Sequence, residues 1–306
     1  MAEETVKLDG WLIVDKPVGI GSTPCVSAVK RGLREGGYSK VKVGHGGTLD
    51  PLASGVLPIA LGEATKLAGR MLDSDKIYEF TITFGAETDT LDAEGAITET
   101  SDHRPTLAGI EAALPRFTGA IEQVPPRYSA LKIDGKPAYA RARAGEEVEI
   151  ESREVTIYSI RHLDEIGDRD VPLDEITLTA HVSKGTYIRS LARDIARGLK
   201  TRGHVTMLHR IKAGSFTLEG AISLDKLAEL AKQRRLEQAL LPLTAGLDDI
   251  PALSVTPDQA RLLRQGQRVV GITAQPGLYL ATDQSVPVAL VESDGTELTV
   301  VRGFNL

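Results

Sequence analysis

Residues 44–55 form the segment of this 306-residue chain whose residue types and spacing most suggest chemistry. The segment reads GHGGTLDPLASG, and its four glycines permit unusual backbone angles and the close approach of a large ligand. Its one carboxylate, Asp50, precedes a proline, which biases Asp50 to an extended conformation. A carboxylate held on such a loop could act as a nucleophile or as a general base.

The residues alone leave two other interpretations of this loop open. A glycine-rich loop can cradle phosphates, but the pattern G-x-x-x-x-G-K-[ST] of a nucleoside-triphosphate site is absent here, which weakens that interpretation. The loop could also be an ordinary turn that Asp50 caps.

Apolar periodicity predicts the elements that must hold this loop. A buried strand at 11–15 and a helix that opens at Thr23-Pro24 come before it. Clean alternation over 77–84 predicts a strand that is covered on one face. A long helix is expected at 186–199. Further strands are expected at 153–162, 174–183 and 205–219, and further helices at 106–115, 137–144 and 223–240.

Charge is distributed unevenly along the chain. The net charge is −6, yet residues 181–215 hold eight Lys or Arg against one acidic residue, and residues 127–143 hold five against one. Arg189, Arg193 and Arg197 fall on one face of the expected helix. Two basic patches on an acidic body indicate a local site for a polyanion, and the alternative is that both are solvated helix faces.

Composition excludes several classes of protein. Hydrophobic residues at 42% and charged residues at 25% are typical of a folded globular chain. The single cysteine, Cys25, excludes an intrachain disulfide and any site of several Cys ligands, and we interpret it as a small filler on a helix. No apolar run approaches the ~20 residues of a membrane helix, and the N-terminus lacks the apolar core of a signal peptide. We therefore expect a cytoplasmic protein.

Seven motifs, in order, resemble those of the bacterial tRNA pseudouridine-55 synthases, the TruB family of pseudouridine synthases. The loop at 44–55 resembles the catalytic signature of that family. The other six are VDKPxG at 14–19, DSDKxY at 73–78, TDTxDAxG at 88–95, PxYSAxK at 126–132, SKGTYIR at 183–189, and GHV at 203–205 with Leu208 and Arg210. The resemblance covers about residues 10–245, and the remainder is more loosely similar to the family's RNA-binding PUA-like domain.

The resemblance implies a uridine isomerisation that needs no cofactor and no metal. The glycosidic bond is broken, the uracil turns, and it is rejoined through carbon rather than nitrogen. Asp50 would be the essential aspartate, and Arg189 would pair with it and keep it oriented. Tyr78 would stack on the uracil. The alternatives are a phosphate contact for Arg189 and packing in the apolar stripe of its strand for Tyr78.

The resemblance also implies a set of substrate-binding residues. His45 would enter the RNA stack and hold the loop open after the target base has left it. Tyr187 would line the pocket and Leu208 would close over the base, with core packing as the alternative for both. Lys16 would support the loop or contact RNA. Phosphate contacts are implied for Lys132, Arg141, Arg193, Arg197, Lys200 and Arg202, and Arg210 completes the substrate-binding set.

The fold implied by the resemblance is α+β: a mixed, largely antiparallel sheet flanked by helices, with a small C-terminal β-barrel-like domain of the PUA type. We expect the catalytic domain at 1–248 and the PUA-like domain at 249–306, docked on the larger one. Gly46 departs from the family, which often has a larger residue there, and we expect this glycine to loosen the loop.

The leading hypothesis is an enzyme that converts uridine 55 in the T-loop of tRNA, as a monomer that needs no guide RNA or protein partner. Guide-RNA-dependent relatives usually carry a fuller C-terminal domain with basic extensions, which this sequence lacks. A second alternative is a protein that binds or remodels tRNA without chemistry. A hydrolase would need a second carboxylate, and nothing in the sequence brings the one candidate, Asp92, near Asp50.

Overall fold

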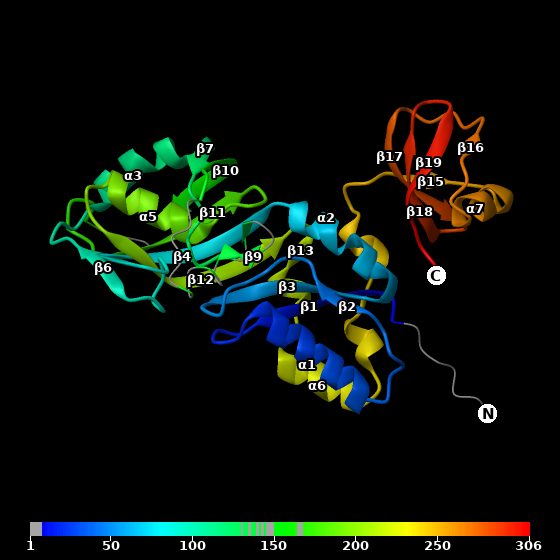
Figure 1. Ribbon diagram of the computed structural model, residues 1–306, viewed down its shortest axis with the longest axis horizontal. Coiled ribbons are helices and arrows are strands. Elements are labelled where there is room, and N and C mark those ends of the chain that lie inside the picture. The colour runs from blue at the N-terminus through cyan, green and yellow to red at the C-terminus, as the bar shows by residue number, and fades with distance from the viewer. Residues whose placement is uncertain are drawn as a thin grey trace.

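A ten-stranded sheet runs through the larger part of the molecule (Figure 1). The computed structural model describes residues 8–129, 131–133, 136–138, 141, 144, 150–163 and 168–306, and at 132, 133, 136 and 137 only the backbone. The strands of the main path are, in order, β14 (Leu241–Pro242), β1 (Gly10–Lys16), β3 (Ala53–Leu61), β12 (Gly203–Ala213), β4 (Lys76–Phe84), β11 (Glu175–Val182), β10 (Arg153–His162) and β7 (Gly119–Gln123). Off this path, β2 (Val43–His45) pairs with β3, and β13 (Phe216–Thr217) pairs with β12.

The sheet is mixed and largely antiparallel, which confirms the expected architecture. Among the strands that the structure describes on this path, β3 and β12 are the one parallel pair. Their register places Ala53 opposite Leu208 and Gly55 opposite Arg210. The end of the Asp50 loop therefore lies directly beside Leu208 and Arg210, for which the resemblance implied substrate binding.

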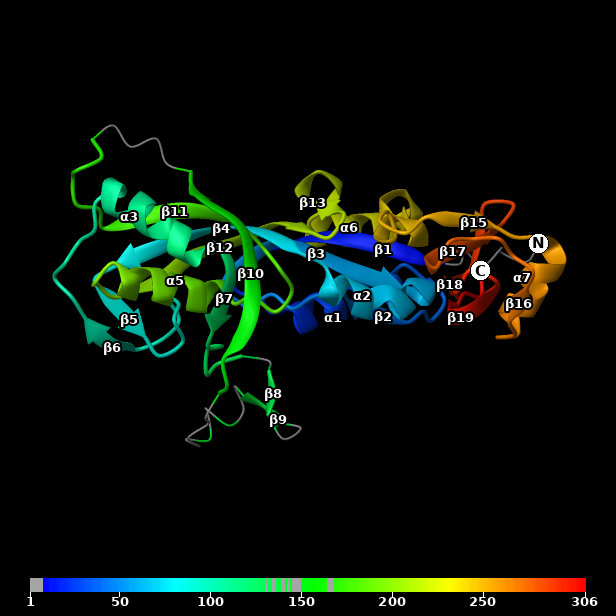
Figure 2. The same ribbon diagram turned by 90° about the horizontal axis from the view of Figure 1, so that it is seen from above.

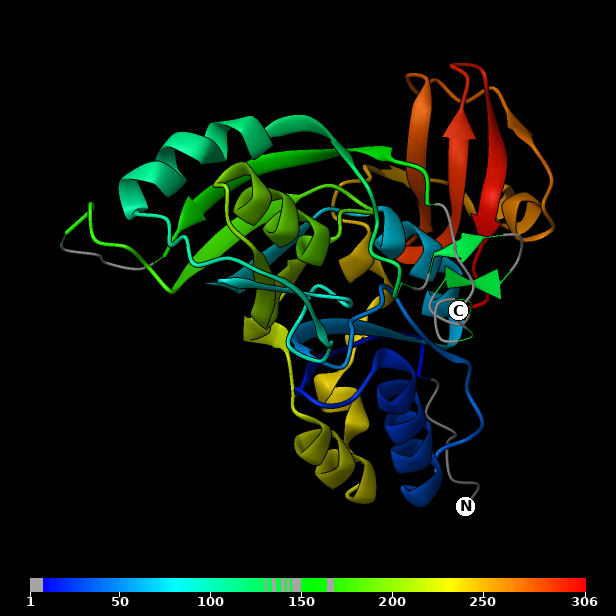
Figure 3. The ribbon, with the colours of Figure 1, turned by 60° about the vertical axis from the view of Figure 1, so that its left-hand side comes forward.

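The half of the sheet that contains β1 and β3 has two apolar faces, because successive side chains of β1 point to opposite sides. Leu12 and Val14 join one core cluster with α1 (Ser22–Glu35) and α6 (Leu224–Lys232), two helices that lie side by side in Figure 3. Trp11 and Ile13 face a second cluster on the other side. A fully covered strand of this kind anchors the loops at its ends.

Helices pack against one face of the other half of the sheet, which contains β4. Phe80 and Ile82 of β4 share the first core cluster with α5 (Ile188–Gly198) and α3 (Leu107–Ala113). On the opposite face, Thr81 and Thr83 form hydrogen bonds of 3.0 and 2.9 Å to threonine hydroxyls of β11 and β12. The expectation of a strand covered on one side is confirmed.

The remaining elements are short. The helix expected over 223–240 is wrong in one respect: α6 ends at Lys232, and the chain turns through Arg234, whose φ of 54° an α-helix does not allow. The pair β8 (Lys132–Ile133) and β9 (Lys136–Pro137) projects from the body in Figure 2. Four of the eight residues of the helix expected at 137–144 lie outside the described residues. The remaining short elements are β5 (Ala86–Thr88), β6 (Ile97–Thr100), β8 (Lys132–Ile133), β9 (Lys136–Pro137), α2 (Ala68–Asp73) and the 3₁₀ turns η1 (Gly62–Leu67), η2 (Leu114–Phe117), η3 (Leu218–Gly220), η4 (Leu236–Ala239) and η5 (Leu243–Gly246).

The C-terminal segment forms a separate five-stranded sheet that docks on the larger body. Its strands lie in the order β15 (Ala252–Ser254), β17 (Gly277–Asp283), β18 (Val286–Ser293), β19 (Glu297–Gly303) and β16 (Val269–Val270), with α7 (Pro257–Arg264) against them. Leu280, Leu290 and Phe304 share the second core cluster with Trp11 of β1, so the expected docking is confirmed. The boundary between 248 and 249 stays a prediction. Within the described ranges, no helix is both long and apolar enough to cross a membrane.

Candidate active site

The Asp50 loop joins β2 to β3 and is fixed by the start of α1. The hydroxyl of Ser22 accepts a hydrogen bond from the Leu49 amide (2.7 Å) and donates one to the Leu49 carbonyl (3.1 Å). Leu49 is buried, whereas the side chain of Asp50 is 38% exposed. Gly55 follows with φ of 99°, and a Cβ there would lie 2.3 Å from the Arg210 carbonyl oxygen. Buried residues on both sides, Leu49 and Ala53, therefore anchor a loop whose one carboxylate reaches solvent.

Gly46 does not loosen this loop as expected. It is buried, and its amide donates to the Pro58 carbonyl at 2.9 Å. A Cβ at this position would lie 2.6 Å from Cγ of Met71. The side chain of Met71 therefore fills the space that a larger residue would occupy, and the backbone stays packed.

Arg189 brings Asp50 into an ion pair, as the resemblance implied. The guanidinium is 5% exposed and lies 2.7 Å from Oδ2 of Asp50. Its remaining donors reach the carbonyls of Thr90 (2.8 Å) and Tyr128 (2.9 Å). Because a guanidinium is a rigid fork, these contacts fix the orientation of the Asp50 carboxylate.

Asp92 is the residue that reasoning from the sequence named but could not place. Its Oδ2 lies 3.3 Å from the Arg189 guanidinium, and its Oδ1 accepts hydrogen bonds from Thr90 Oγ1 (2.5 Å) and the Glu94 amide (3.1 Å). Burial, together with the charges of Asp92 and Asp50, raises the pKa of Glu94. The motif at 88–95 was the available signal, since it carries three of these groups. Asp92 is 2% exposed and bonded from several sides, so it braces Arg189 rather than acting as the second carboxylate of a glycosidase.

Arg210 lies under the loop and not on its substrate side. It is 1% exposed, and its guanidinium donates to the carbonyls of Val56 (2.8 Å), Gly47 (3.3 Å) and Thr48 (3.4 Å). The same group lies 6.0 Å from the ring centroid of Tyr78, which places that tyrosine beside the Asp50 loop. The geometry gives Arg210 the role of supporting the loop instead of the expected contact with substrate.

Lys16 is corrected in the same way. It is fully buried, and its ammonium donates to the carbonyls of Pro17 (2.9 Å) and Ile20 (2.5 Å). Burial lowers the pKa of Lys16, and the charge of Asp50 opposes this shift. Of its two expected roles, support of the loop fits this position and an RNA contact does not.

His45, Tyr187 and Leu208 surround the loop at different depths. His45 ends β2 half-buried, and burial followed by the charge of Arg210 lowers its pKa, so the ring is neutral near pH 7. Tyr187 precedes α5, with the Arg153 guanidinium 4.8 Å from its ring centroid. Leu208 is 6% exposed and belongs to the core cluster, so packing and a contact with the base both remain open.

The arginines expected to face phosphates are engaged with the protein itself. Arg197 forms two hydrogen bonds to Glu87 (2.6 and 2.9 Å), and Arg202 pairs with Glu99 at 2.6 Å. Arg193 binds Asp194 at 2.8 Å. The side chain of Lys132 lies outside the described part of the chain. A phosphate contact by these arginines stays a prediction, and it would require that their carboxylate partners give way.

The fold and the site together define an enzyme, because a passive binder has no need for a carboxylate that a buried arginine orients. In a solved structure described as an H/ACA RNP bound to a substrate RNA containing 2′-deoxyuridine, one chain shares this fold. The TM-score is 0.72 at 22% identity, over 98% of this chain and 86% of that one.

Residues 35–188 match the N-terminal domain model of the TruB family of pseudouridylate synthases, and residues 189–248 match the C-terminal domain model of tRNA pseudouridylate synthase B. The chain is 60% identical over 301 residues to tRNA pseudouridine synthase B of Zymomonas mobilis, which covers 98% of this chain and 97% of that relative. It is also 60% identical over 299 residues to the protein of the same name from Novosphingobium aromaticivorans, with 98% of each chain covered. The chain belongs to the TruB family of pseudouridylate synthases.

Proposed function

We propose that this protein is a tRNA pseudouridine synthase that isomerises uridine 55 in the T-loop and needs neither a guide RNA nor a protein partner. The single observation that carries the proposal is the pairing of Asp50 with Arg189 on the loop at 44–55. Relatives that are 60% identical over nearly the whole chain are named tRNA pseudouridine synthase B, which supports tRNA as substrate. We also place the enzyme in the cytoplasm as a monomer, with a catalytic domain at 1–248 and an RNA-binding domain at 249–306.

The reaction breaks the bond between N1 of uracil and C1′ of ribose and forms a bond between C5 and C1′. The proton leaves C5, and N1 ends protonated, so the product is an isomer of the substrate. Arg189 holds Oδ2 of Asp50, which leaves Oδ1 for the substrate. Asp50 thus acts as nucleophile or base, and Arg189 keeps it in place through every step.

The target uridine must leave the folded T-loop before Asp50 can reach it, which costs a few kcal/mol. The neutral ring of His45 takes the place of the lost stacking and offsets part of that cost. Tyr78, Tyr187 and Leu208 enclose the extruded base. In this arrangement Lys16 and Arg210 hold the loop from beneath and make no contact with RNA.

Tritium release tests this function directly. Unmodified tRNA carrying 5-tritiated uridine is incubated with the purified chain alone, and the product is mapped by nucleotide. We expect one equivalent of tritium per tRNA and a single pseudouridine at position 55, with no release when that position is cytidine. Release only after a guide RNA is added would favour the guide-dependent alternative. Tight tRNA binding without any release would favour a binding or remodelling protein.

A further inference from the structure

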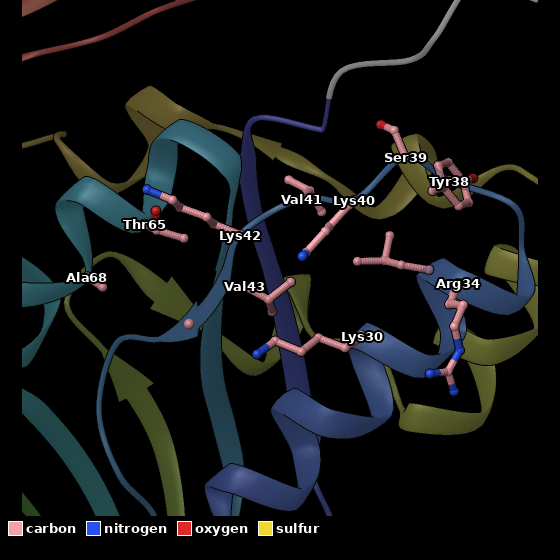
Figure 4. A pocket seen from close by; sticks show the side chains of 12 residues that line it. Lys30, Arg34, Tyr38, Ser39, Lys40, Val41, Lys42, Val43, Thr65 and Ala68 are labelled. Carbon is pink, nitrogen blue, oxygen red and sulfur yellow. The ribbon is translucent and has the colours of Figure 1, made fainter.

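A groove of about 930 Å³ lies beside α1, outside the Asp50 site (Figure 4). Its floor is apolar and comes from Leu33 of α1 and from Val41 and Val43. The side chains of Lys30 and Lys40 extend on either side of Val43 in Figure 4. The basic residues that line the groove are Lys30, Arg34, Lys40 and Lys42, and all four are exposed.

These four cations differ from the arginines of α5, whose charges are paired with carboxylates of the protein. No ion pair joins any of them to an acidic residue in the described part of the chain. Hydrogen bonds from Lys66 (2.6 Å) and Asn305 outweigh burial and lower the pKa of Glu63, and the charge of Lys42 adds a smaller contribution. In a chain of net charge −6, four such cations around one hollow indicate an anion-binding surface.

The groove is continuous with the catalytic loop through β2. Val43 and Gly44 line the groove, and His45 follows them in the same strand. Three strand residues span about 10 Å, so the groove begins a short distance from the residue we propose to enter the RNA stack. A chain that passes His45 on its way out of the site reaches this hollow within a few nucleotides.

We propose that this groove binds the RNA strand that flanks the reacting uridine, with its phosphates on Lys30, Arg34, Lys40 and Lys42 and its sugars and bases against the apolar floor. The inference rests on the proposed function, since it assigns a second contact to the same substrate. Lysines are point charges suited to phosphates, and such contacts position RNA without reading its sequence. A base that is out of its stack gains from an apolar surface, which explains the mixed lining.

Charge removal tests the groove against a matched control. The double variant Lys30→Gln/Lys42→Gln removes two groove cations. Its control, Arg31→Gln/Lys232→Gln, removes two exposed cations from α1 and α6 that do not line the groove. We expect the Kd for tRNA to rise about tenfold in the groove variant only, and the slope of log K against log salt to fall by about 1.4, or 0.7 for each lost contact with a single strand. The single-turnover rate at saturating enzyme should stay within about twofold of wild type.

Tethered cleavage tests which part of the RNA lies there. Ser39 lines the groove and is exposed, whereas the native Cys25 is fully buried, so Ser39→Cys gives one reactive thiol for a cleavage reagent. We expect cuts within a few nucleotides of the modified uridine, and none from Lys232→Cys.

The outcomes separate this inference from the proposed function. A wild-type chain that converts no uridine contradicts the proposed function, whatever the groove variants do. A wild type that converts uridine, with equal Kd and salt slope in the groove and control variants, overturns the groove inference alone. If the flanking strand is not cut, the groove inference is overturned as well. The groove would then bind a small anion or an acidic protein segment instead of RNA.

Discussion

Asp50 and Arg189 differ in solvent exposure, and this difference gives them different roles in the site. Asp50 is 38% exposed and can meet a substrate, whereas Arg189 is 5% exposed and can touch only protein. Four acceptors surround the guanidinium: the carboxylates of Asp50 and Asp92 and the carbonyls of Thr90 and Tyr128. Because both terminal nitrogens of the guanidinium are engaged, its orientation is fixed, and this fixes Asp50 before substrate binds.

Replacing Arg189 with lysine should lower the single-turnover rate at least about 100-fold. Lysine keeps the charge but cannot reach four acceptors, so Asp50 loses its fixed orientation and buried acceptors lose their donors. Rapid-quench assays with saturating enzyme measure this rate. The control is Arg104→Lys, which alters a surface pair with Asp174. Equal rates in the two variants would mean that Arg189 supplies charge alone.

Lys76 provides a pH test of burial. Burial lowers its pKa to about 8, and its ammonium donates to the carbonyls of Met71, Leu72 and Ser74. Between pH 8 and 10.5 the unfolded chain keeps the proton that the folded chain has lost, so the free energy of unfolding rises with pH in that window. Relative to Lys76→Met, wild type should gain at most about 3 kcal/mol across it. Urea titrations at several pH values measure the difference, and a gap that is constant with pH would contradict the shift.

The sequence predicted some residues of the site well and others poorly. Asp50 and Arg189 were singled out because each lies in a motif that resembles the family's, and it was this resemblance that implied their pairing. The burial of Lys16 and Arg210 was not predicted, because a local sequence does not show that a lysine or arginine is fully buried. Asp92 was found but not placed, since its contact with Arg189 joins residues that are far apart in the chain.

At the scale of elements, the start of α5 is held by the end of β7 and by the segment that follows it. The amide of Tyr187 donates to Oε1 of the fully buried Gln123 at 2.7 Å, and Ser190 Oγ donates to the Val124 carbonyl at 2.8 Å. Arg189 lies between these two attachment points and itself reaches Tyr128. The position of the arginine thus depends on residues 123–128.

Gln123→Met should lower the maximal rate about tenfold with little change in KM, because the first turn of α5 loses its acceptor and Arg189 shifts. Gln123→Glu should retain more of the rate, since a carboxylate accepts the same hydrogen bond and suits the N-terminus of a helix. Steady-state kinetics on tRNA separate the two parameters. A rise in KM at unchanged maximal rate would assign Gln123 to RNA binding instead.

Elements with a strong period were predictable, and short ones were not. The alternation over 77–84 gave both the strand and its single covered face. The helix expected at 223–240 was too long because it ends in a left-handed cap at Arg234, where the amides of Arg234 and Arg235 donate to the carbonyls of Ala231 and Leu230. No glycine marks this cap in the sequence. Strands of two or three residues, such as β15 and β16, have too few positions to show a period.

At the scale of the whole molecule, the C-terminal sheet is part of the second core cluster. Phe304 is 1% exposed and packs in that cluster with Trp11 of β1. The Asn305 amide also donates to Glu63 at 2.7 Å, and Lys66 donates to the Gly303 carbonyl at 2.9 Å. Because these contacts join the C-terminal segment to β1 and η1 of the larger body, we expect the two parts to unfold together.

Phe304→Ala should lower the free energy of unfolding by about 3–5 kcal/mol and separate the two sheets into independent transitions. Phe304→Leu, which keeps most of the volume, should cost less than about 1.5 kcal/mol and leave one transition. Urea unfolding followed by tryptophan fluorescence reports on both, since Trp11 lies in the same cluster. A small loss in the alanine variant would show that the sheets are only loosely associated.

The measurement that tests the central claim most directly is the rate of pseudouridine formation by Asp50→Asn beside wild type, at saturating enzyme in a single turnover. Asparagine keeps the shape of the side chain and removes the charge that Arg189 orients. We predict a rate lower by on the order of 10⁴-fold or more, with the Kd for tRNA changed by less than about threefold, because Asp50 acts in the chemical step. A variant that forms pseudouridine at nearly the wild-type rate would contradict the assignment of Asp50 as the catalytic residue.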